Sequence, residues 1–457
     1  MILAANSSGW KTTMKQLPKA FRGVLRVSIL LVLSLDAQIP LQAATGTAAA
    51  TGPDIELQDF RLGELEAKLS KMQPGPERDY FAGVLANRTG HIAESERLLN
   101  SALPGIRESN PHRAEVALET LGDDYTKSFD YSAAAGVYDE LLSRFAGHLD
   151  ATQLRGIKGT SDLMHILQKT PAQTIAWAGP TKLKTARNVL GSANAELTVN
   201  GIREQWLLDT GAGMSVVSKS FAQRLGLTPL TGAARTRAGV TGIENQLKLA
   251  VLRELPIGGA TLHNVVVLVL DDANLNIQYS AHDKYQINGI VGYPVFQALG
   301  AVSFLHDGGF AAGEAARTGA TGARMYMMDL KPVVEAAVGD KNLPFTFDTG
   351  ASSSDLSVRY FKLFQHKSSA WKQSTDKVSG AGGVVSRKIY VQPMLVLGIG
   401  DKTVTLNDVT VSPSATGAPN DELYGNLGQD VVAKFDSFTL DFVKMTFSLG
   451  EPLSGAH

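Results

Sequence analysis

The pattern of hydrophobic and polar positions divides the chain into a helical part and a β part. Between about residues 55 and 170, apolar and alanine positions recur at the spacing of one helix face. The segments with this spacing are Leu62–Met72, Tyr80–Thr89, Ile92–Leu103, Ala114–Lys127, Ser132–Phe145 and Ala151–Leu167. From about residue 190 onward, short runs rich in Val, Leu and Phe predict strands. We therefore predict a multidomain protein, with an α-helical domain before an all-β part.

The predicted strands fall into two similar series. The first comprises Ala195–Val199, Gln205–Leu208, Leu247–Leu255, Val265–Leu270 and Gly300–Leu305, with a short helix at Ser218–Leu225. The second comprises Leu343–Phe347, Ser386–Leu397, Val404–Val411 and Ser437–Phe447, with a short helix at Ser357–Gln365. A unit of about 110 to 125 residues is large enough to bury a core of its own.

Short motifs repeat between the two series at a nearly constant distance along the chain. Asp209-Thr210-Gly211-Ala212 returns as Asp348-Thr349-Gly350-Ala351. Gly289-Ile290-Val291-Gly292 returns, at almost the same separation, as Gly425-Asn426-Leu427-Gly428. This period is far longer than that of a solenoid repeat and indicates a duplicated unit. We predict two homologous lobes at residues 190–306 and 325–450, joined by an Ala- and Gly-rich linker at 307–324.

The two Asp-Thr-Gly motifs are the candidate catalytic elements. Each follows an apolar run, so each would deliver a carboxylate to a turn at a strand end. If the turns face each other, Asp209 and Asp348 share one site, where two like charges cannot both ionise easily. The alternative is two ordinary turns, because Asp and Gly are common turn residues.

These residues resemble a known family. Asp-Thr-Gly-Ala after an apolar strand, followed by Ser-Lys-Ser-Phe-Ala-Gln-Arg-Leu-Gly-Leu at 218–227, is similar to bacterial retropepsin-like aspartic proteases. Gly289–Gly292 resembles the apolar-apolar-Gly element beside their catalytic turn. The resemblance covers about residues 190–450. It implies two retropepsin-like β-barrel lobes that form a pepsin-like, pseudo-twofold bilobal unit within one monomer.

The resemblance also implies roles for the motif residues. Asp209 and Asp348 would hold one water, with one carboxylate as general base and the other as general acid on a peptide or protein substrate. Thr210 and Thr349 would hydrogen-bond across the lobes, and Gly211 and Gly350 would let backbone amides approach the carboxylates. For both threonines, simple turn filling is the alternative.

Two glycine-rich segments are candidates for mobile flaps over the substrate. Each follows its Asp by roughly 30 residues, and glycine permits a tight hairpin tip. The candidate residues are Gly239, Val240, Thr241 and Gly242 in the first lobe, and Gly380, Ala381, Gly382 and Gly383 in the second. Ordinary hairpin loops are the alternative reading.

Composition removes several other function classes. The chain has no Cys, which excludes thiol catalysis, thiolate metal ligands and disulfides. Its nine His residues show no metal-binding spacing, so we expect no metal and no cofactor. With a net charge of −1 and no basic stripe, nothing favours nucleic-acid binding.

The helical domain, residues 55–170, resembles tetratricopeptide repeats. Gly90-His91-Ile92-Ala93 returns as Asp130-Tyr131-Ser132-Ala133, and an inserted loop expected at Asn110-Pro111 makes this spacing longer than the usual repeat. Such helix pairs often present a concave surface, which implies a protein partner or peptide. A helical spacer or prodomain without a ligand is the alternative.

Residues 1–44 are typical of an export segment. Basic residues precede the nine-residue apolar core Val27–Leu35, and small residues near Gln42-Ala43-Ala44 offer a cleavage site. Met14 is an alternative start, and an uncleaved inner-membrane anchor is an alternative fate.

Together, the export segment and the two Asp-Thr-Gly motifs predict a periplasmic or secreted aspartic endopeptidase. The alternative is a non-catalytic peptide-binding or scaffold protein with the same fold.

Overall fold

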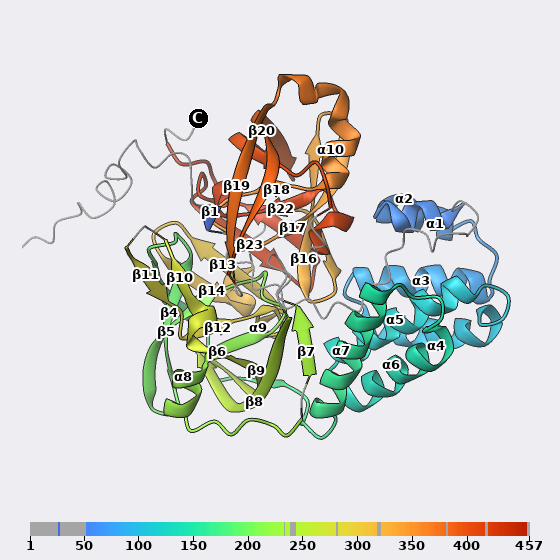
Figure 1. Cartoon of the computed structure of the whole chain (residues 1–457), viewed down its shortest axis with the longest axis horizontal. Helices are drawn as coiled ribbons and strands as arrows, with labels where there is room; N and C mark the ends of the chain where they lie inside the picture. Colours follow the sequence, from blue (N-terminus) through green and yellow to red (C-terminus); the bar gives the residue numbers. More distant parts are fainter. Residues whose placement is uncertain are drawn as a thin grey trace, which may run out of the picture.

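The structure of the chain is a computed structural model. It describes residues 26–27, 52–232, 234–237, 244–279, 282–317, 321–380, 383–415 and 419–454. The helices of residues 53–167 gather on one side of the molecule and the strands on the other (Figure 1). This confirms the predicted helical region followed by a mostly β region.

Seven helices form the first part of the chain. They are α1 (Pro53–Gln58), α2 (Leu62–Leu69), α3 (Pro76–Arg88), α4 (Ile92–Ile106), α5 (Pro111–Lys127), α6 (Tyr131–Phe145) and α7 (Ala151–Leu167). From α3 to α7, each helix packs against the next. The Asn110 side chain accepts a hydrogen bond from Arg113 N at the start of α5, and Asp130 does the same from Ala133 N at α6.

The loop expected at Asn110-Pro111 ends at Asn110, because a helix begins at Pro111. Asn110 is the N-cap of α5 and Pro111 is its first residue, where a missing N–H costs nothing. The helix before it, α4, continues through Pro104 to Ile106. The tetratricopeptide resemblance stays a prediction.

The first β region begins earlier than predicted and carries more strands. Its strands are β2 (Thr174–Trp177), β3 (Thr181–Arg187), β4 (Ala193–Val199), β5 (Ile202–Leu208), β6 (Ser215–Ser218), β7 (Ala234–Arg237), β8 (Glu244–Ile257), β9 (Ala260–Leu270), β10 (Asn276–Gln278), β11 (Lys284–Gln286), β12 (Gly289–Val291) and β13 (Ala301–Leu305). Two short helices, α8 (Lys219–Arg224) and α9 (Tyr293–Leu299), interrupt them. At the site, β12 pairs in parallel with β5, so that Ile290 lies beside Leu207.

The second β region repeats this order of elements. Its strands are β15 (Ala323–Met328), β16 (Lys331–Val338), β17 (Lys341–Phe347), β18 (Asp355–Leu356), β19 (Lys372–Gly380), β20 (Gly383–Ile399), β21 (Lys402–Val411), β22 (Gly425–Leu427), β23 (Ser437–Asp441) and β24 (Thr446–Leu449). Its short helices are α10 (Val358–Phe364) and α11 (Gln429–Val432). Strand β22 pairs in parallel with β17, as β12 does with β5.

Two expectations about this part of the chain were wrong. The segment 307–324 was expected to be a linker, but it contains β14 (Gly309–Ala312), which pairs with both β13 and β3. The run Ser437–Phe447 was expected to be one strand, but it is split between β23 and β24. The Asp441 carboxylate accepts hydrogen bonds from Val443 N and Lys444 N, and this local turn ends the first strand.

One apolar core extends through both β regions. Strand β13 pairs antiparallel with β23, and the rings of Phe304 and Phe438 stack across that pair with centroids 4.8 Å apart. On β5, Trp206 and Leu208 face this core. Leu207 faces the opposite side, and side-chain alternation puts Asp209 on the same side as Leu207. The core therefore fixes the strands that end at the two motifs.

No helix within the described ranges is long and apolar enough to cross a membrane. The predicted export segment lies outside those ranges except for Arg26 and Val27. These two residues form β1 and pair in parallel with β19.

We predict that Gly122→Ala destabilises the helical region. A Cβ at Gly122 would lie 2.5 Å from the Tyr138 ring, so α5 and α6 would have to separate. Overpacking of this kind costs about 1–3 kcal/mol in the free energy of unfolding, measurable by urea denaturation. The matched control is Gly136→Ala in α6, where a Cβ would meet nothing within 4 Å. This control should stabilise the protein by about 0.5–1 kcal/mol. Equal effects at both positions would contradict the packing argument.

Candidate active site

Asp209 and Asp348 stand at the ends of equivalent strands. Asp209 follows β5, and its backbone N donates to Val291 O of β12 at 3.1 Å. Asp348 follows β17, and its N donates to Leu427 O of β22 at 3.0 Å. Both residues are buried, with 0% and 2% of their surface exposed. The strands Gly289–Val291 and Gly425–Leu427, each followed by a glycine, therefore position the backbones of the two aspartates.

Each carboxylate is held by its own turn through one oxygen. Gly211 N and Ala212 N donate to Asp209 Oδ1 at 2.9 and 3.2 Å. Gly350 N and Ala351 N donate to Asp348 Oδ1 at 2.6 and 3.2 Å. Among the described residues, no N–H or hydroxyl group donates to the outer oxygens, Asp209 Oδ2 and Asp348 Oδ2. The two carboxyls hydrogen-bond to each other. Each carboxylate thus has one fixed oxygen and one available oxygen.

The two threonines link the turns reciprocally. Thr210 N donates to Thr349 Oγ1 at 2.9 Å, and Thr349 N donates to Thr210 Oγ1 at 3.1 Å. Their hydroxyls then donate to the opposite strand: Thr349 Oγ1 to Leu208 O at 2.8 Å, and Thr210 Oγ1 to Phe347 O at 3.3 Å. Four hydrogen bonds between buried groups therefore fix one turn against the other.

The motif glycines face the opposite aspartate. A Cβ at Gly350 would lie 2.5 Å from Asp209 Oδ2, and a Cβ at Gly211 would collide with the Asp348 carboxyl carbon. We expected glycine here so that amides could approach the carboxylate of the same turn. The structure adds a stronger reason, because any side chain would displace the carboxylate of the other turn.

Burial raises the pKa of both aspartates. For Asp209, the negative charge of Asp348 raises the pKa further, to well above its usual value. For Asp348, protonated Asp209 and the N–H groups of its own turn oppose the effect of burial on the pKa, as does the charge of Lys331. Burial and the mutual repulsion of the two carboxylates therefore favour a state in which the pair retains one proton.

Sequence reasoning missed several residues that support the turns. Ser215 Oγ accepts from Gly292 N at 3.1 Å, and Ser354 Oγ accepts from Gly428 N at 3.0 Å. These serines are separated along the chain by the same interval as the two aspartates, so the Asp-Thr-Gly repeat could have revealed them. Gln429 donates to Thr349 O at 2.6 Å and accepts from Arg187 at 2.7 Å. No signal in the sequence marked that contact.

The predicted flaps fall largely outside the described ranges. Gly239, Val240, Thr241 and Gly242 lie outside them, as do Ala381 and Gly382. Gly380 ends β19 and Gly383 begins β20, and the two face each other in the antiparallel register. The flap function stays a prediction.

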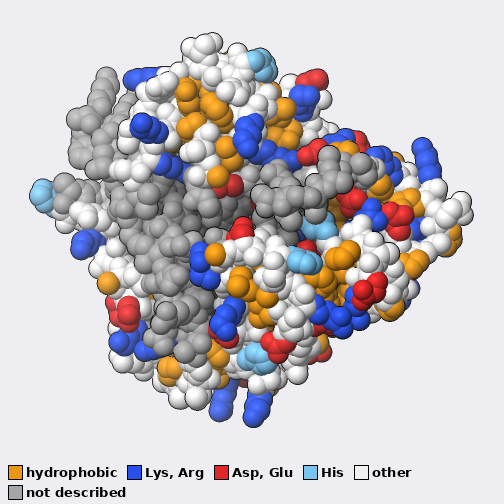
Figure 2. All heavy atoms as spheres, turned by 45° about the vertical axis from the view of Figure 1, so that its right-hand side comes forward, with side chains coloured by type: hydrophobic (Ala, Val, Ile, Leu, Met, Phe, Trp, Pro, Cys, Tyr) orange, Lys and Arg blue, Asp and Glu red, His pale blue; other side chains and the backbone are white. Residues whose placement is uncertain are grey.

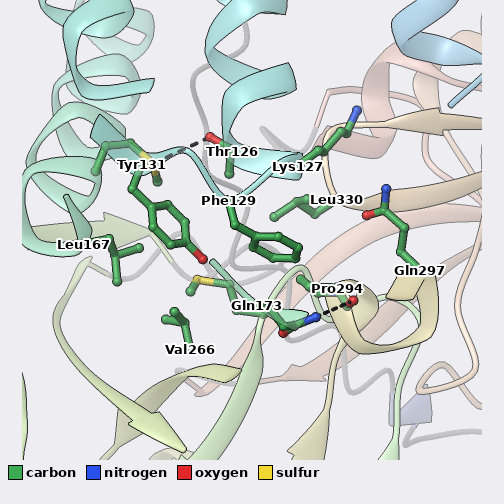
Figure 3. A pocket seen from close by; sticks show the side chains of 12 residues that line it. Thr126, Lys127, Phe129, Tyr131, Leu167, Gln173, Val266, Pro294, Gln297 and Leu330 are labelled. Carbon is green, nitrogen blue, oxygen red and sulfur yellow. Dashed lines mark hydrogen bonds between the residues drawn. The ribbon is translucent and has the colours of Figure 1, made fainter. Parts of the chain in front are cut away.

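A small cavity lies where the helices meet the β regions (Figure 3). Its volume is about 30 Å³, and Phe129, Tyr131 and Leu167 of the helical part contribute to its lining. From the β side, the lining includes Met214, shortly after Asp209, and Leu330, next to Lys331. The helical part therefore adjoins the segments that carry the two aspartates.

The described residues contain no group of three or more His, Asp or Glu side chains that could hold a metal ion. On the face shown in Figure 2, acidic and basic side chains are interspersed over the described surface.

Comparison with known proteins supports an aspartyl protease fold. The aspartyl protease family model matches residues 195–295, which include the first Asp-Thr-Gly motif. No relative was found among curated proteins.

Solved structures similar to this chain include basic 7S globulin from soybean (11% identity, 61% of this chain and 96% of that chain, TM-score 0.39). Conglutin gamma, a basic 7S globulin from lupine seeds, is 11% identical, and the match covers 61% of this chain and 97% of that chain with a TM-score of 0.39. A retropepsin-like aspartic protease from Rickettsia conorii is 21% identical, and the match covers 31% of this chain and 92% of that chain with a TM-score of 0.22.

We predict that Asp209→Asn stabilises the protein at neutral pH. The pKa of Asp209 is raised in the folded state. Its protonated form therefore contributes to the free energy of unfolding at pH values below the unfolded-state pKa. This contribution is lost as the pH rises through the folded-state pKa, because a buried charge then forms. Each pKa unit corresponds to about 1.4 kcal/mol. The gain in Tm over wild type should be largest near neutrality and should shrink in acid. Asp401→Asn, at an exposed turn, is the control. A gain independent of pH would contradict the assignment.

Proposed function

We propose that this protein is an aspartic endopeptidase in which Asp209 and Asp348 together activate one water molecule. The observation that carries the proposal is the reciprocal pairing of two Asp-Thr-Gly turns, which leaves one available oxygen on each of two adjacent buried carboxylates. A water between those oxygens would lie next to one base and one acid. Two like charges in one buried site favour such a singly protonated state.

The proposed reaction needs only this pair and water. Asp348, ionised, takes a proton from the water while the water oxygen forms a bond to the peptide carbonyl carbon. Asp209, protonated, gives its proton to the carbonyl oxygen, which forms a geminal diol. Asp348 then gives its proton to the amide nitrogen while the C–N bond breaks. Asp209 recovers a proton from a diol hydroxyl, and the pair returns to its starting state.

We further propose that the two β regions act as the two lobes of one pseudo-twofold unit. Their turns, their parallel strand pairs β5–β12 and β17–β22, and their serine contacts to Gly292 and Gly428 recur in the same arrangement. Each lobe would supply one aspartate and one flap. The active protein would then be a monomer.

The helical domain is proposed to hold a substrate or a protein partner beside the catalytic pair. The Arg359 guanidinium fixes its first helix to the second β region, with bonds to Asp59 Oδ1 at 2.6 Å and to Gln58 O at 3.1 Å. Phe60 also packs edge-on against Tyr326 with ring centroids 5.8 Å apart. A domain fixed in this way can form one wall of a binding site. The export pattern of residues 1–44 supports action in the periplasm or outside the cell.

We predict that Asp209→Asn and Asp348→Asn each abolish cleavage. Loss of one acid–base group lowers the rate by about 10²–10⁴-fold, and here both groups act in each step. Cleavage of a mixed peptide library by the purified protein, across pH and with a statine-type inhibitor, measures this effect. Wild-type activity should be highest on the acid side of neutrality. Asp401→Asn should retain activity. Equal cleavage by wild type and both variants would exclude the mechanism, and wild-type peptide binding without cleavage would favour the non-catalytic alternative.

We also predict that specific activity does not change on dilution. Both aspartates come from one chain, so no association step is needed to form the pair. Initial rates per mole of protein should stay constant from micromolar to nanomolar concentration. A loss of specific activity on dilution, with a matching change in sedimentation, would show that a dimer forms the site.

A further inference from the structure

The two aspartates face different residues across their hairpins. In the second β region, Val333 of β16 pairs with Thr346 of β17. Continuing this antiparallel register by two positions sets Lys331 opposite Asp348. In the first region, Asn194 of β4 pairs with Leu207 of β5, and the same continuation sets Ser192 opposite Asp209. Directly opposed residues point to the same face of a sheet.

The core confirms which face this is. Val334 and Phe345, an opposed pair, both belong to the core that extends through the β regions. Val333 faces the other side. Because side chains alternate along a strand, Lys331 lies on the side of Val333, which is also the side of the Asp348 carboxylate.

Lys331 is a buried residue whose charge acts on the pair. Only 4% of its surface is exposed, and burying an ammonium group is costly without a nearby negative charge. Its charge lowers the pKa of the Asp348 carboxyl, against the effect of burial. Ser192 is also fully buried, but it is neutral, and its hydroxyl lies 3.5 Å from Gly350 O of the opposite turn.

We propose that Lys331 is a positioning residue that keeps the negative charge of the pair on Asp348, so that Asp348 is the base and Asp209 the acid. The proposal rests on the proposed function and deepens it. Two identical half-sites would share the proton equally, and neither aspartate would have a fixed role. A cation on one side and a hydroxyl on the other remove that equivalence. The duplicated unit thus performs an asymmetric reaction.

Other charged groups near these elements have partners of their own. Arg187 of β3 donates to Gln429, which in turn donates to Thr349 O. Lys127 of α5 is paired with Asp123. On the β15–β16 turn, Asp329 acts on Glu422 and on Tyr138 of α6. Within the catalytic pair itself, Asp348 is the charged neighbour that acts on Asp209.

The test is the pH dependence of kcat/KM for Lys331→Met, a neutral side chain of similar length. Removing the cation should raise the pKa of Asp348, so the base becomes protonated at higher pH. The acid limb of the profile should therefore move up by about one pH unit or more. Lys331→Arg should keep the limb near its wild-type position, and Ser192→Ala should not move it. A lower rate with an unmoved limb in a folded Lys331→Met variant would show a merely structural role and overturn the proposal.

A second readout separates this proposal from the proposed function. The protein is labelled with ¹³C at the aspartate carboxyl carbon, and Asp209→Asn and Asp348→Asn assign the two signals by NMR. Asp348 should titrate at lower pH than Asp209 in wild type, and at higher pH in Lys331→Met than in wild type. Lys331→Gln serves if Lys331→Met does not fold. An unchanged Asp348 titration overturns the role of Lys331 even if the enzyme is active. Wild type that cleaves nothing but shows the expected titrations would overturn only the proposed function.

Discussion

The structure around the candidate site depends on the reciprocal hydrogen bonds between Thr210 and Thr349. Two buried carboxylates side by side repel each other, and an unsupported pair of turns would move apart. Each threonine accepts from the other's backbone and donates to the other's strand, so separation would break four hydrogen bonds between buried groups. Asp209 and Asp348 can therefore be close without further support from the helices.

The close approach of the two turns explains why glycines, parallel strands and serines surround both aspartates. Gly211 and Gly350 lack side chains because the opposite carboxylate occupies the space. The parallel strands β12 and β22 supply carbonyls to the aspartate backbones, and Ser215 and Ser354 hold the glycines that follow those strands. The cost of burying two acids is met by retaining a proton, which is also what the proposed chemistry requires.

The two Asp-Thr-Gly turns form two similar half-sites, and the residues beside them make the halves different. When the two hairpin registers are continued past their last pairs, Lys331 and Ser192 fall at matching positions, yet only Lys331 is charged. A similar contrast appears at Gln429, which binds Arg187, and at Tyr293, the matching residue after Gly292, which contacts Met327. In each contrast, the half-site of Asp348 has the cation, Lys331 or Arg187, and the matching residue of the other half-site is neutral.

The sequence by itself determined the candidate pair, the two series of strands and most helices, because Asp-Thr-Gly turns and apolar periodicity are local signals. Local signals could not place strands such as β14, whose partner β3 is far away in the chain and whose pairing with β3 and β13 overrides its Gly- and Ala-rich composition. Nor could they show that Lys331 lies opposite Asp348, because that neighbourhood arises from hairpin register. Only the tertiary structure brings the two turns, their serines and the buried lysine together, since contacts between strands depend on pairing rather than on residue type.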